Sequence, residues 1–313
     1  MPRKLRIQYP GAVYHLMNRG DRREVIFADE EDRERFLKTL GQACEKTGWQ
    51  VHAYCLMSNH FHLVLETPQP NLVAGMKWFL GTYTTRFNRR HKEFGHLFSG
   101  RYKSLVVDGS GNGYLKSVCD YVHLNPVRAR LLEEHQLLES FVWSSYGQYL
   151  KAPCHRCNWL RVDRLFGEWG IPKDSSAGRR RFGQVMEHRR KQESPKSDWK
   201  AIERGWCLGD EQFRAQLLEQ VRELRGDHYG EEFRQADEAH ALALLQKEIN
   251  GRRWTEEDLA QRRKGDAEKL KIAWRLRQET TMTLKWIAKK LHMGSWTYLS
   301  NSLAAKRKAK QKE

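Results

Sequence analysis

The sequence predicts an α+β domain followed by an all-α extension. Short runs of alternating apolar and polar residues mark strands in the first half of the chain, and amphipathic helical stretches separate them. From about residue 199 onward the apolar residues recur with a helical period instead. A chain of 313 residues is long enough to form two or three domains, each with its own core.

The elements predicted in the first half follow a defined order. They are a strand over 12–18, a helix over 30–47 with Asp29 as its N-cap, strands over 49–57 and 60–66, a helix over 72–90, a strand over 103–107 and a helix over 113–125. This β-α-β-β-α-β order is typical of the ferredoxin-like split βαβ arrangement, in which an antiparallel sheet carries helices on one face.

Three regions are predicted after a first domain at 1–150. They are a basic linker region at 151–200, a helical region at 201–250 and a helical region at 251–313 that ends in a basic tail at 306–312. Within the first region, residues 171–197 are interpreted as a partly ordered linker or a basic helix. In the last region, helices at 283–291 and 296–303 flank a turn that contains Gly294. This pattern is typical of a DNA-binding helix-turn-helix, but a plain helical hairpin has the same apolar spacing.

Two histidines stand two residues apart in one predicted strand. Because side chains alternate faces along a strand, His60 and His62 point the same way, about 7 Å apart, while Phe61 points the other way. Two imidazoles on one face can bind one divalent ion.

A tyrosine and an asparagine lie on one face of the helix predicted over 113–125. Tyr121 and Asn125 are four residues apart, and Pro126 interrupts or turns the helix just after them. The Asn125 carbonyl is a candidate oxygen ligand for the ion held by the histidines. Tyr114 is a rival nucleophile on nearly the same face, but it lacks an asparagine four residues later, so we interpret it as a packing or DNA-contact residue.

This combination suits metal-assisted attack by a tyrosine on a nucleic-acid phosphodiester. A tyrosine hydroxyl has a pKa near ~10 and is a weak nucleophile at neutral pH unless its phenolate is stabilised. A divalent ion contributes to that and acts as a Lewis acid on the phosphate. Imidazole and carbonyl ligands with open positions suit Mg²⁺ or Mn²⁺ better than a closed zinc site.

The chain is strongly basic, which indicates a polyanionic partner. It has 56 Lys and Arg against 39 Asp and Glu, a net charge of +17, and a pI near 9.7. The excess of positive charge is +5 over residues 1–150 and +12 over the rest, so we expect the later part to supply much of the nonspecific DNA affinity.

Basic and aromatic residues interleave around 86–92 and 98–103, which suits a single strand of DNA with exposed bases. A solvated helix end and an ordinary loop have the same composition. The predicted DNA contacts are Arg86, Arg89, Arg90, Arg101, Tyr102, Lys103 and Arg128.

At these residues the chain resembles the single-tyrosine HUH endonucleases, and more closely the REP-associated tyrosine transposases, relatives of the smallest insertion-sequence transposases. The matching blocks are Tyr14–Gly20, Met57–His62, Gly100–Ser104 and Tyr121–Ala129, which cover roughly the first half of the chain in the family's order. The resemblance implies that His60, His62 and Asn125 hold Mg²⁺ or Mn²⁺. It implies that Tyr121 attacks single-stranded DNA, keeps the 5′ phosphate and releases a 3′ hydroxyl, and that the DNA partners are hairpins formed by short palindromes.

The cysteines and the hydropathy bear on location. Six irregularly spaced cysteines indicate free thiols in a reducing cytoplasm. Cys154 and Cys157 have the spacing of half a zinc site, with Cys207 as a distant candidate, but a second pair is missing. No signal peptide or membrane span is expected, and the predicted location is the cytoplasm, in association with the nucleoid.

The sequence therefore predicts a metal-dependent single-stranded DNA endonuclease and strand transferase with Tyr121 as its nucleophile. Two alternatives stay open: a non-catalytic DNA-binding regulator that keeps the fold, and an HUH enzyme that nicks DNA at replication origins or during plasmid transfer. The sequence also leaves open whether the site forms within one chain or across a homodimer.

Overall fold

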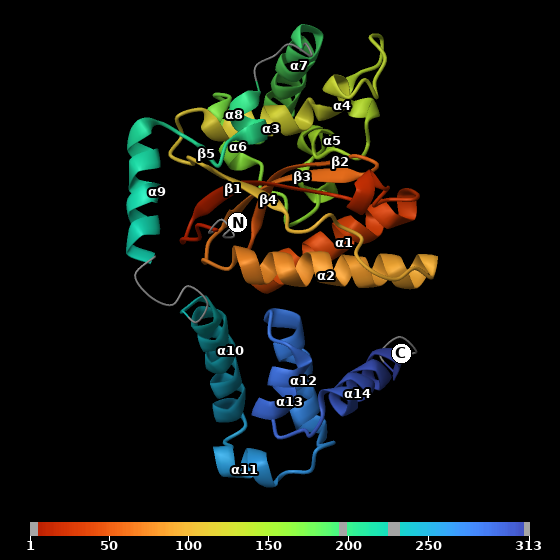
Figure 1. The fold of residues 1–313 in the computed structure, drawn as a ribbon, viewed down its shortest axis with the longest axis vertical. Helices are drawn as coiled ribbons and strands as arrows, with labels where there is room; N and C mark the ends of the chain where they lie inside the picture. The colour runs from red at the N-terminus through yellow and green to blue at the C-terminus, as the bar shows by residue number, and fades with distance from the viewer. Residues whose placement is uncertain (1–5, 194–198, 225–231, 310–313) are drawn as a thin grey trace. The chain divides into compact units, whose positions relative to one another are not determined.

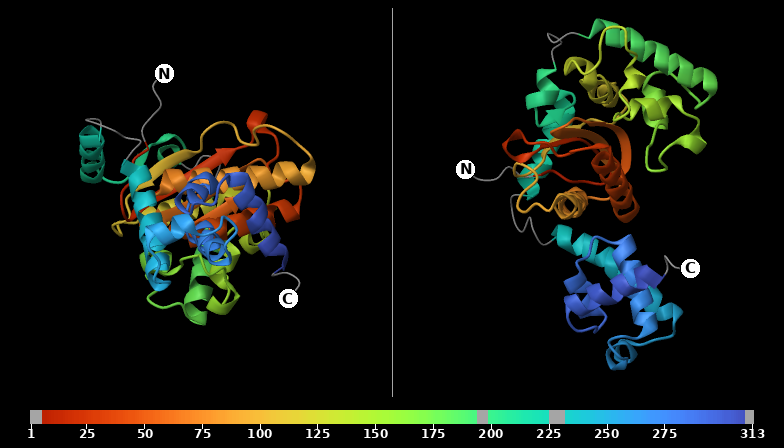
Figure 2. Two further views of the ribbon diagram at one scale, coloured as in Figure 1. Left: turned by 90° about the horizontal axis from the view of Figure 1, so that it is seen from below. Right: turned by 90° about the vertical axis from the view of Figure 1, so that its right-hand side faces the viewer.

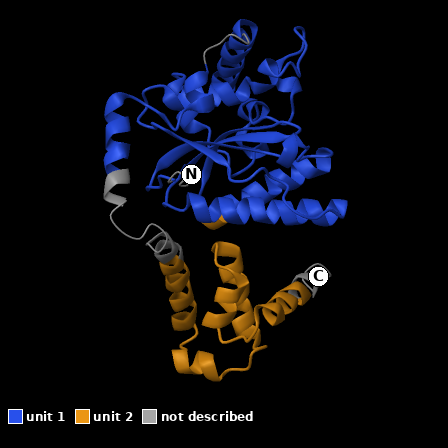
Figure 3. Ribbon diagram, viewed as in Figure 1, with its two compact units in different colours: residues 1–44, 48–224 blue, residues 45–47, 225–313 orange. Residues whose placement is uncertain are grey.

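The computed structural model describes residues 6–193, 199–224 and 232–309. The chain divides into two compact units (Figure 3): unit 1 contains residues 1–44 and 48–224, and unit 2 contains residues 45–47 and 225–313. Each unit has its own hydrophobic core. Among the described helices, none has both the length and the apolar character that crossing a membrane requires.

Unit 1 begins with the β-α-β-β-α-β order that the sequence predicts. The elements are β1 (Ala12–Arg19), α1 (Glu30–Thr47), β2 (Gln50–Leu56), β3 (His60–Thr67), α2 (Leu72–His91) and β4 (Lys103–Val107). Asp29 caps α1, since its side chain accepts a hydrogen bond from the backbone N–H of Asp32 at 3.1 Å. Gly48 ends the same helix in a left-handed conformation, with φ of 72°.

The first four strands form an antiparallel sheet in the order β2-β3-β1-β4, which places β3 and β1 in its centre. The predicted α+β, ferredoxin-like fold is therefore confirmed. The structure adds a short fifth strand, β5 (Cys207–Leu208), which pairs with β4 in parallel. Two residues are too few to show a period in the sequence, so this strand was not predicted.

The two faces of the sheet are covered by different helices (Figures 1 and 2). α1 and α2 cover one face, and α3 (Tyr114–His123) lies on the other. On the face of α1 and α2, the ring of Phe61 packs against Phe36 and Phe79, with centroid distances of 5.0 and 6.4 Å. Because side chains alternate along a strand, His60 and His62 face the opposite side, toward α3.

The tyrosine helix is interrupted where the sequence predicts. α3 ends at His123, and a short helix, α4 (Asn125–Arg128), begins two residues later. Pro126 lies in the first turn of α4, where its missing N–H leaves no hydrogen bond unmade. The N–H of Leu124 still bonds to the carbonyl of Asp120 at 2.9 Å, so the helical turn continues through the break and keeps Asn125 near Tyr121.

The residues that follow α4 complete unit 1 with further helices. Several of these helices lie within 151–200, where the sequence predicts a basic linker region. The helices are α5 (Tyr146–Leu150), α6 (Asp163–Glu168), α7 (Ser176–Gln192), α8 (Lys200–Arg204) and α9 (Glu211–Leu224), with single 3-10 turns at Leu138–Ser140 and Pro153–His155. In α7, Phe182 and Met186 are four residues apart and fully buried between runs of arginine. The basic composition hides this apolar stripe, and unit 1 extends to residue 224.

Unit 2 is all-α, as predicted. Its helices are α10 (Glu232–Gly251), α11 (Glu256–Gln261), α12 (Ala267–Glu279), α13 (Leu284–Lys290) and α14 (Trp296–Ala309). The N-cap Thr283 accepts a hydrogen bond from the N–H of Trp286, and Gly294 has φ of 78° in the turn between α13 and α14. The two predicted helices thus form around a tight turn, a geometry that fits both a DNA-binding helix-turn-helix and a plain helical hairpin. Residues 310–312 of the predicted basic tail lie outside the described residues, and 306–309 continue α14.

Candidate active site

The two histidines of β3 lie side by side beneath α3. Their ring centroids are 5.1 Å apart, with His60 half-buried and His62 fully buried. The register pairs His62 with Met17 on β1 and Cys55 on β2, so it lies in the interior of the sheet. The position of His60 at the start of β3 leaves that ring the more accessible of the two.

Tyr121 and Asn125 reach the same place from above the sheet. The Tyr121 ring lies edge-on to the His62 ring, with centroids 5.6 Å apart. The Nδ2 atom of Asn125 lies 3.2 Å from Nε2 of His62. The four residues singled out from the sequence are therefore brought together in one buried cluster. Tyr114, at the first position of α3, is half-buried and packs against the core at the other end of the helix.

His15 on β1 joins this cluster, although no motif in the sequence assigned it a role. Its Nε2 atom lies 3.0 Å from Nδ1 of His62, and the two rings are stacked with centroids 5.2 Å apart. His15, Met17 and Arg19 alternate along β1 on the face that carries the histidines of β3. That alternation is visible in the block Tyr14–Gly20, but only the strand register shows what it faces.

All three imidazoles are neutral at neutral pH. Burial, with a smaller contribution from the cation Arg128, lowers the pKa of His15 to about 3. Burial, with a smaller contribution from Arg19, lowers the pKa of His60 to about 4. Burial and the two neighbouring imidazoles hold the pKa of His62 well below its usual range. A neutral imidazole has a free lone pair, which is the form that binds a metal ion.

The donor set fits a divalent ion that prefers few protein ligands. Among the described residues, no group of three or more His, Cys, Asp or Glu side chains is arranged to hold a metal ion. The candidate donors are instead the imidazoles of His60 and His62 with the amide of Asn125, which leave several coordination positions open. The cysteines that the sequence offers as part of a zinc site, Cys154, Cys157 and Cys207, are free thiols in the structure.

Arg128 and Trp199 enclose the tyrosine. The guanidinium carbon of Arg128 lies 4.1 Å from the centre of the Tyr121 ring, and the Trp199 ring lies edge-on at 5.5 Å. Glu193 contacts both Trp199 and Arg128. Its Oε1 atom accepts a hydrogen bond from Trp199 Nε1 at 2.9 Å and lies 3.4 Å from Arg128 Nη1. Burial raises the pKa of the Tyr121 hydroxyl, and Arg128 partly offsets this. Trp199 and Glu193 were not singled out from the sequence, because they lie more than 65 residues from the motif.

The predicted DNA contacts divide between two places. Lys103 pairs in register with Met17, which in turn pairs with His62, so Lys103 lies on the histidine face, and the exposed Arg101 precedes it. Tyr102 is buried, and Arg6 stacks on its ring at 3.6 Å. Arg128 lies within the cluster itself.

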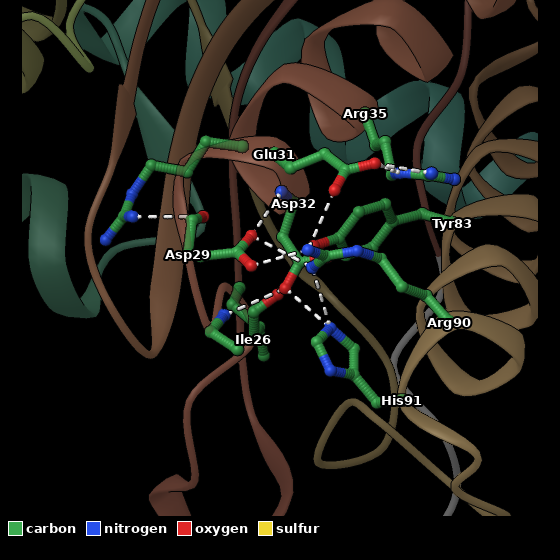
Figure 4. Close-up of polar contacts among 10 residues, drawn as sticks. Ile26, Asp29, Glu31, Asp32, Arg35, Tyr83, Arg90 and His91 are labelled. Carbon is green, nitrogen blue, oxygen red and sulfur yellow. Dashed lines mark hydrogen bonds and ion pairs between the residues drawn. The ribbon is translucent and has the colours of Figure 1, made fainter.

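The three predicted contacts on α2 lie on the opposite face of the sheet (Figures 1 and 2). Figure 4 shows that Arg90 is held between Asp29 and Asp32, with its Nη1 atom 2.9 and 2.8 Å from the carboxylate oxygens. Arg86 donates to Thr39 and Gln42, and Arg89 is exposed. Arg86 and Arg90 therefore join α2 to α1, and DNA contact by this group stays a prediction.

The comparison with known families supports an enzyme that acts on DNA, of the transposase class. Residues 8–125 match the family described as "Transposase IS200 like", and this segment ends at Asn125 after including His60, His62 and Tyr121. This segment is therefore similar to the IS200-like transposases, which supports the resemblance found in the sequence.

The chain is also similar to a solved structure, at low sequence identity. That structure is a REP-associated tyrosine transposase bound to a REP hairpin, with 11% sequence identity and a TM-score of 0.41; the match covers 51% of this chain and 92% of that one. A search of curated proteins found no match.

Proposed function

We propose that this protein is a metal-dependent single-stranded DNA endonuclease and strand transferase that acts on hairpin-forming palindromic repeats. Tyr121 is the nucleophile, and His60, His62 and Asn125 would hold Mg²⁺ or Mn²⁺. The observation that carries the proposal is the position of the Tyr121 ring 5.6 Å from the His62 ring, while Asn125 contacts the same imidazole at 3.2 Å. One nucleophile and three donors thus meet in one cluster within the segment that is similar to the IS200-like transposases.

The proposed chemical step exchanges one phosphodiester for another. The Oη atom of Tyr121 forms a bond to phosphorus, the bond from phosphorus to the 3′ oxygen breaks, and that oxygen leaves as a 3′ hydroxyl after taking a proton from solvent. The tyrosine proton is lost to solvent, and the 5′ phosphate stays on the enzyme as a phosphotyrosine ester. A 3′ hydroxyl can reverse the step, so strand transfer or rejoining needs no ATP.

The side chains around the tyrosine suit this step. When bound, the ion would supply Lewis-acid stabilisation of charge on the phosphate. Arg128 makes the phenolate less unfavourable than burial alone would, because its guanidinium lies 4.1 Å from the ring centre. Arg19 lies beside His60 on the strand register and adds positive charge where a phosphate would approach.

The DNA is proposed to bind through two parts of the chain. In unit 1, Arg101 and Lys103 lie at the end of the sheet where β3 begins and suit the phosphates of a single strand. In unit 2, α14 begins with Trp296 and Tyr298, which are 53% and 43% exposed, and is proposed as the recognition helix of a duplex-binding helix-turn-helix. A stem and its single-stranded flank would thereby each have a binding surface.

The test is a search for the covalent ester. The purified chain is incubated with labelled single-stranded hairpin DNA taken from beside its gene, with Mn²⁺ or with EDTA, and resolved on denaturing gels. We expect an adduct that needs Mn²⁺, disappears in Tyr121→Phe and persists in the matched control Tyr114→Phe. Tight binding without an adduct for several hairpins would favour the regulator, and cleavage confined to a replicon origin would favour the replication or transfer nickase.

A further inference from the structure

We propose that His15 is a positioning residue that fixes which nitrogen of His62 is free to bind the ion. The inference rests on the proposed function of the cluster and adds a residue to it. His15 lies on the central strand β1, is 4% exposed, and places its Nε2 atom 3.0 Å from Nδ1 of His62. His15 faces Nδ1 of His62 and Asn125 faces Nε2, so an ion that binds Nε2 would replace the hydrogen bond from the Asn125 amide.

The contact with Asn125 assigns the proton on His62. An Asn Nδ2 atom can only donate, so His62 Nε2, which lies 3.2 Å from it, must be the accepting and unprotonated nitrogen. A neutral imidazole carries one proton, which must then be on Nδ1 of His62. That proton is donated to His15 Nε2, and His15 in turn carries its own proton on Nδ1. The hydrogen bonds run in one direction, from Asn125 to His62 to His15.

The same arrangement prepares His62 as a ligand. A metal-bound histidine usually donates its other ring N–H to a fixed acceptor, which sets the tautomer and the orientation of the ring. His15 is such an acceptor, because its ring is stacked on His62 with an interplanar angle of 11° and its backbone pairs with Val64 on β3 and Leu105 on β4. Neighbouring strands on both sides prevent the ring from moving away.

His15 is not itself a third ligand. Its Nε2 lone pair faces the proton on His62 Nδ1, so an ion could take that lone pair only by breaking the contact that orients His62. The acceptor is also an imidazole and not a carboxylate, so it orients His62 without adding negative charge to the site.

A direct test reads the tautomer without any metal. Two-bond ¹⁵N–¹H correlation spectra of the full chain, labelled with ¹⁵N-histidine and assigned with His62→Gln, report which ring nitrogen carries the proton. We expect His62 to be protonated on Nδ1 in the wild type and to become a mixture of tautomers in His15→Leu. Protonation of His62 on Nε2 in the wild type would overturn the proposal.

A second test measures Mn²⁺ affinity by calorimetry in three variants. His15→Leu removes the acceptor at similar volume and is expected to weaken Mn²⁺ binding about 10- to 100-fold. His15→Gln, whose amide reaches the same position, is expected to restore affinity to within about threefold. His15→Asn, which is too short to reach His62, should behave like His15→Leu and serves in its place if that variant does not fold.

The outcomes separate this inference from the proposed function. If the wild type binds Mn²⁺ and forms the adduct while folded His15→Leu binds the ion equally well, His15 only fills space and the inference is wrong. If His15→Leu and His15→Gln lose Mn²⁺ affinity to the same extent, the loss comes from altered packing and not from the hydrogen bond, which also overturns the inference. If the wild type neither binds Mn²⁺ nor forms an adduct, the proposed function fails and this inference fails with it.

Discussion

Two buried histidines lie near opposite ends of β3, and their partners differ. Where the strand ends, Nε2 of His52 lies 3.3 Å from Oε2 of Glu66, and the same carboxylate pairs with Arg164 at 2.5 Å and Arg161 at 3.3 Å. Where the strand begins, His62 contacts an imidazole and an amide. We call these the Glu66 end and the His62 end.

The difference supports the proposal that the His62 end binds a ligand. At the Glu66 end each charge meets an opposite charge, which leaves little for an outside group to neutralise. At the His62 end, Arg19 and Lys103 have no carboxylate partner among the described residues, and the Nε atom of Arg19 is buried without a hydrogen bond. The Nδ1 atom of His52 at the Glu66 end is likewise buried without a hydrogen bond, so the distinction rests on charge. The two cations at the His62 end suit a phosphate of DNA.

The largest expected effect is on catalysis at the His62 end. His60→Ala should lower the rate of metal-dependent adduct formation by at least ~100-fold, because a ligand of the proposed ion is lost. The free energy of unfolding should change little, since the ring is half-buried at the start of the strand. Quenched-flow gels give the rate and urea unfolding gives the stability.

The matched variant is His52→Ala at the Glu66 end. It should reverse the pattern and destabilise the fold, because His52 is fully buried and contacts Glu66, while the folded fraction keeps the wild-type rate of adduct formation. Wild-type adduct formation by His60→Ala would remove this residue from the ion site and end the distinction between the two ends.

The next effect is at the arginine beside the nucleophile. Arg128→Lys keeps a charge but loses the planar guanidinium that stacks on Tyr121 and reaches its backbone carbonyl and Glu193. We expect the single-turnover rate to fall about 10- to 100-fold with DNA affinity nearly unchanged. Arg161→Lys at the Glu66 end is the control and should keep the rate. A loss of affinity without a loss of rate would make Arg128 a DNA contact only.

How far the sequence predicted this site depends on which interactions are local. The strands on either side of the turn before His60 and the spacing of Tyr121 and Asn125 follow from periods of two and 3.6 residues. The first six elements were therefore predicted correctly, and the catalytic roles of the four residues stay a prediction. The partners that come from other strands were not predicted: His15 meets His62 only through the β1–β3 register.

Long-range packing explains the remaining differences. Trp199 and Glu193 reach Tyr121 from a part of the chain that follows several intervening helices, and no local period encodes that approach. The segment that contains α7 was predicted as a partly ordered linker or a basic helix, because its arginine runs outweigh the two apolar residues that anchor it. Charge composition alone therefore did not distinguish a solvated segment from a helix with one buried stripe.

A smaller effect is expected on stability at the Glu66 end, with a defined pH dependence. The hydrogen bond from His52, together with Arg164, lowers the pKa of Glu66 from 4.5 to about 2. A carboxyl whose pKa is lower in the folded state stabilises the fold above its unfolded pKa, and that contribution is lost as the pH falls toward 2. Glu66→Gln should therefore lower the free energy of unfolding by about 2 kcal/mol at pH 7, a value between those of exposed and buried pairs.

The measurement is urea unfolding of Glu66→Gln and the wild type at several pH values. The difference between them should stay constant from pH 8 to about pH 5 and shrink below that. A difference that is independent of pH down to about pH 2 would mean that the glutamine disturbs packing and not charge. Adduct formation at pH 7 should be unaffected, because the His62 end is at the other end of the strand.

The smallest expected effect concerns the predicted DNA contacts and compares the two faces of the sheet. Arg101 is exposed on the loop that leads into β4 at the His62 end. Arg90 lies on α2 and is paired with Asp29 and Asp32 at the start of α1. Arg101→Ala should weaken binding of single-stranded DNA about three- to fivefold and reduce the slope of log affinity against log salt by about one.

Arg90→Ala should leave both the affinity and the salt slope unchanged and lower the thermal midpoint, because the carboxylate partners of Arg90 already neutralise its charge. Fluorescence anisotropy across a salt series measures the affinities, and calorimetry measures the midpoints. If Arg90→Ala instead reduces the salt slope as Arg101→Ala does, the DNA also follows the α2 face, and the single strand must extend around the edge of the sheet to reach both.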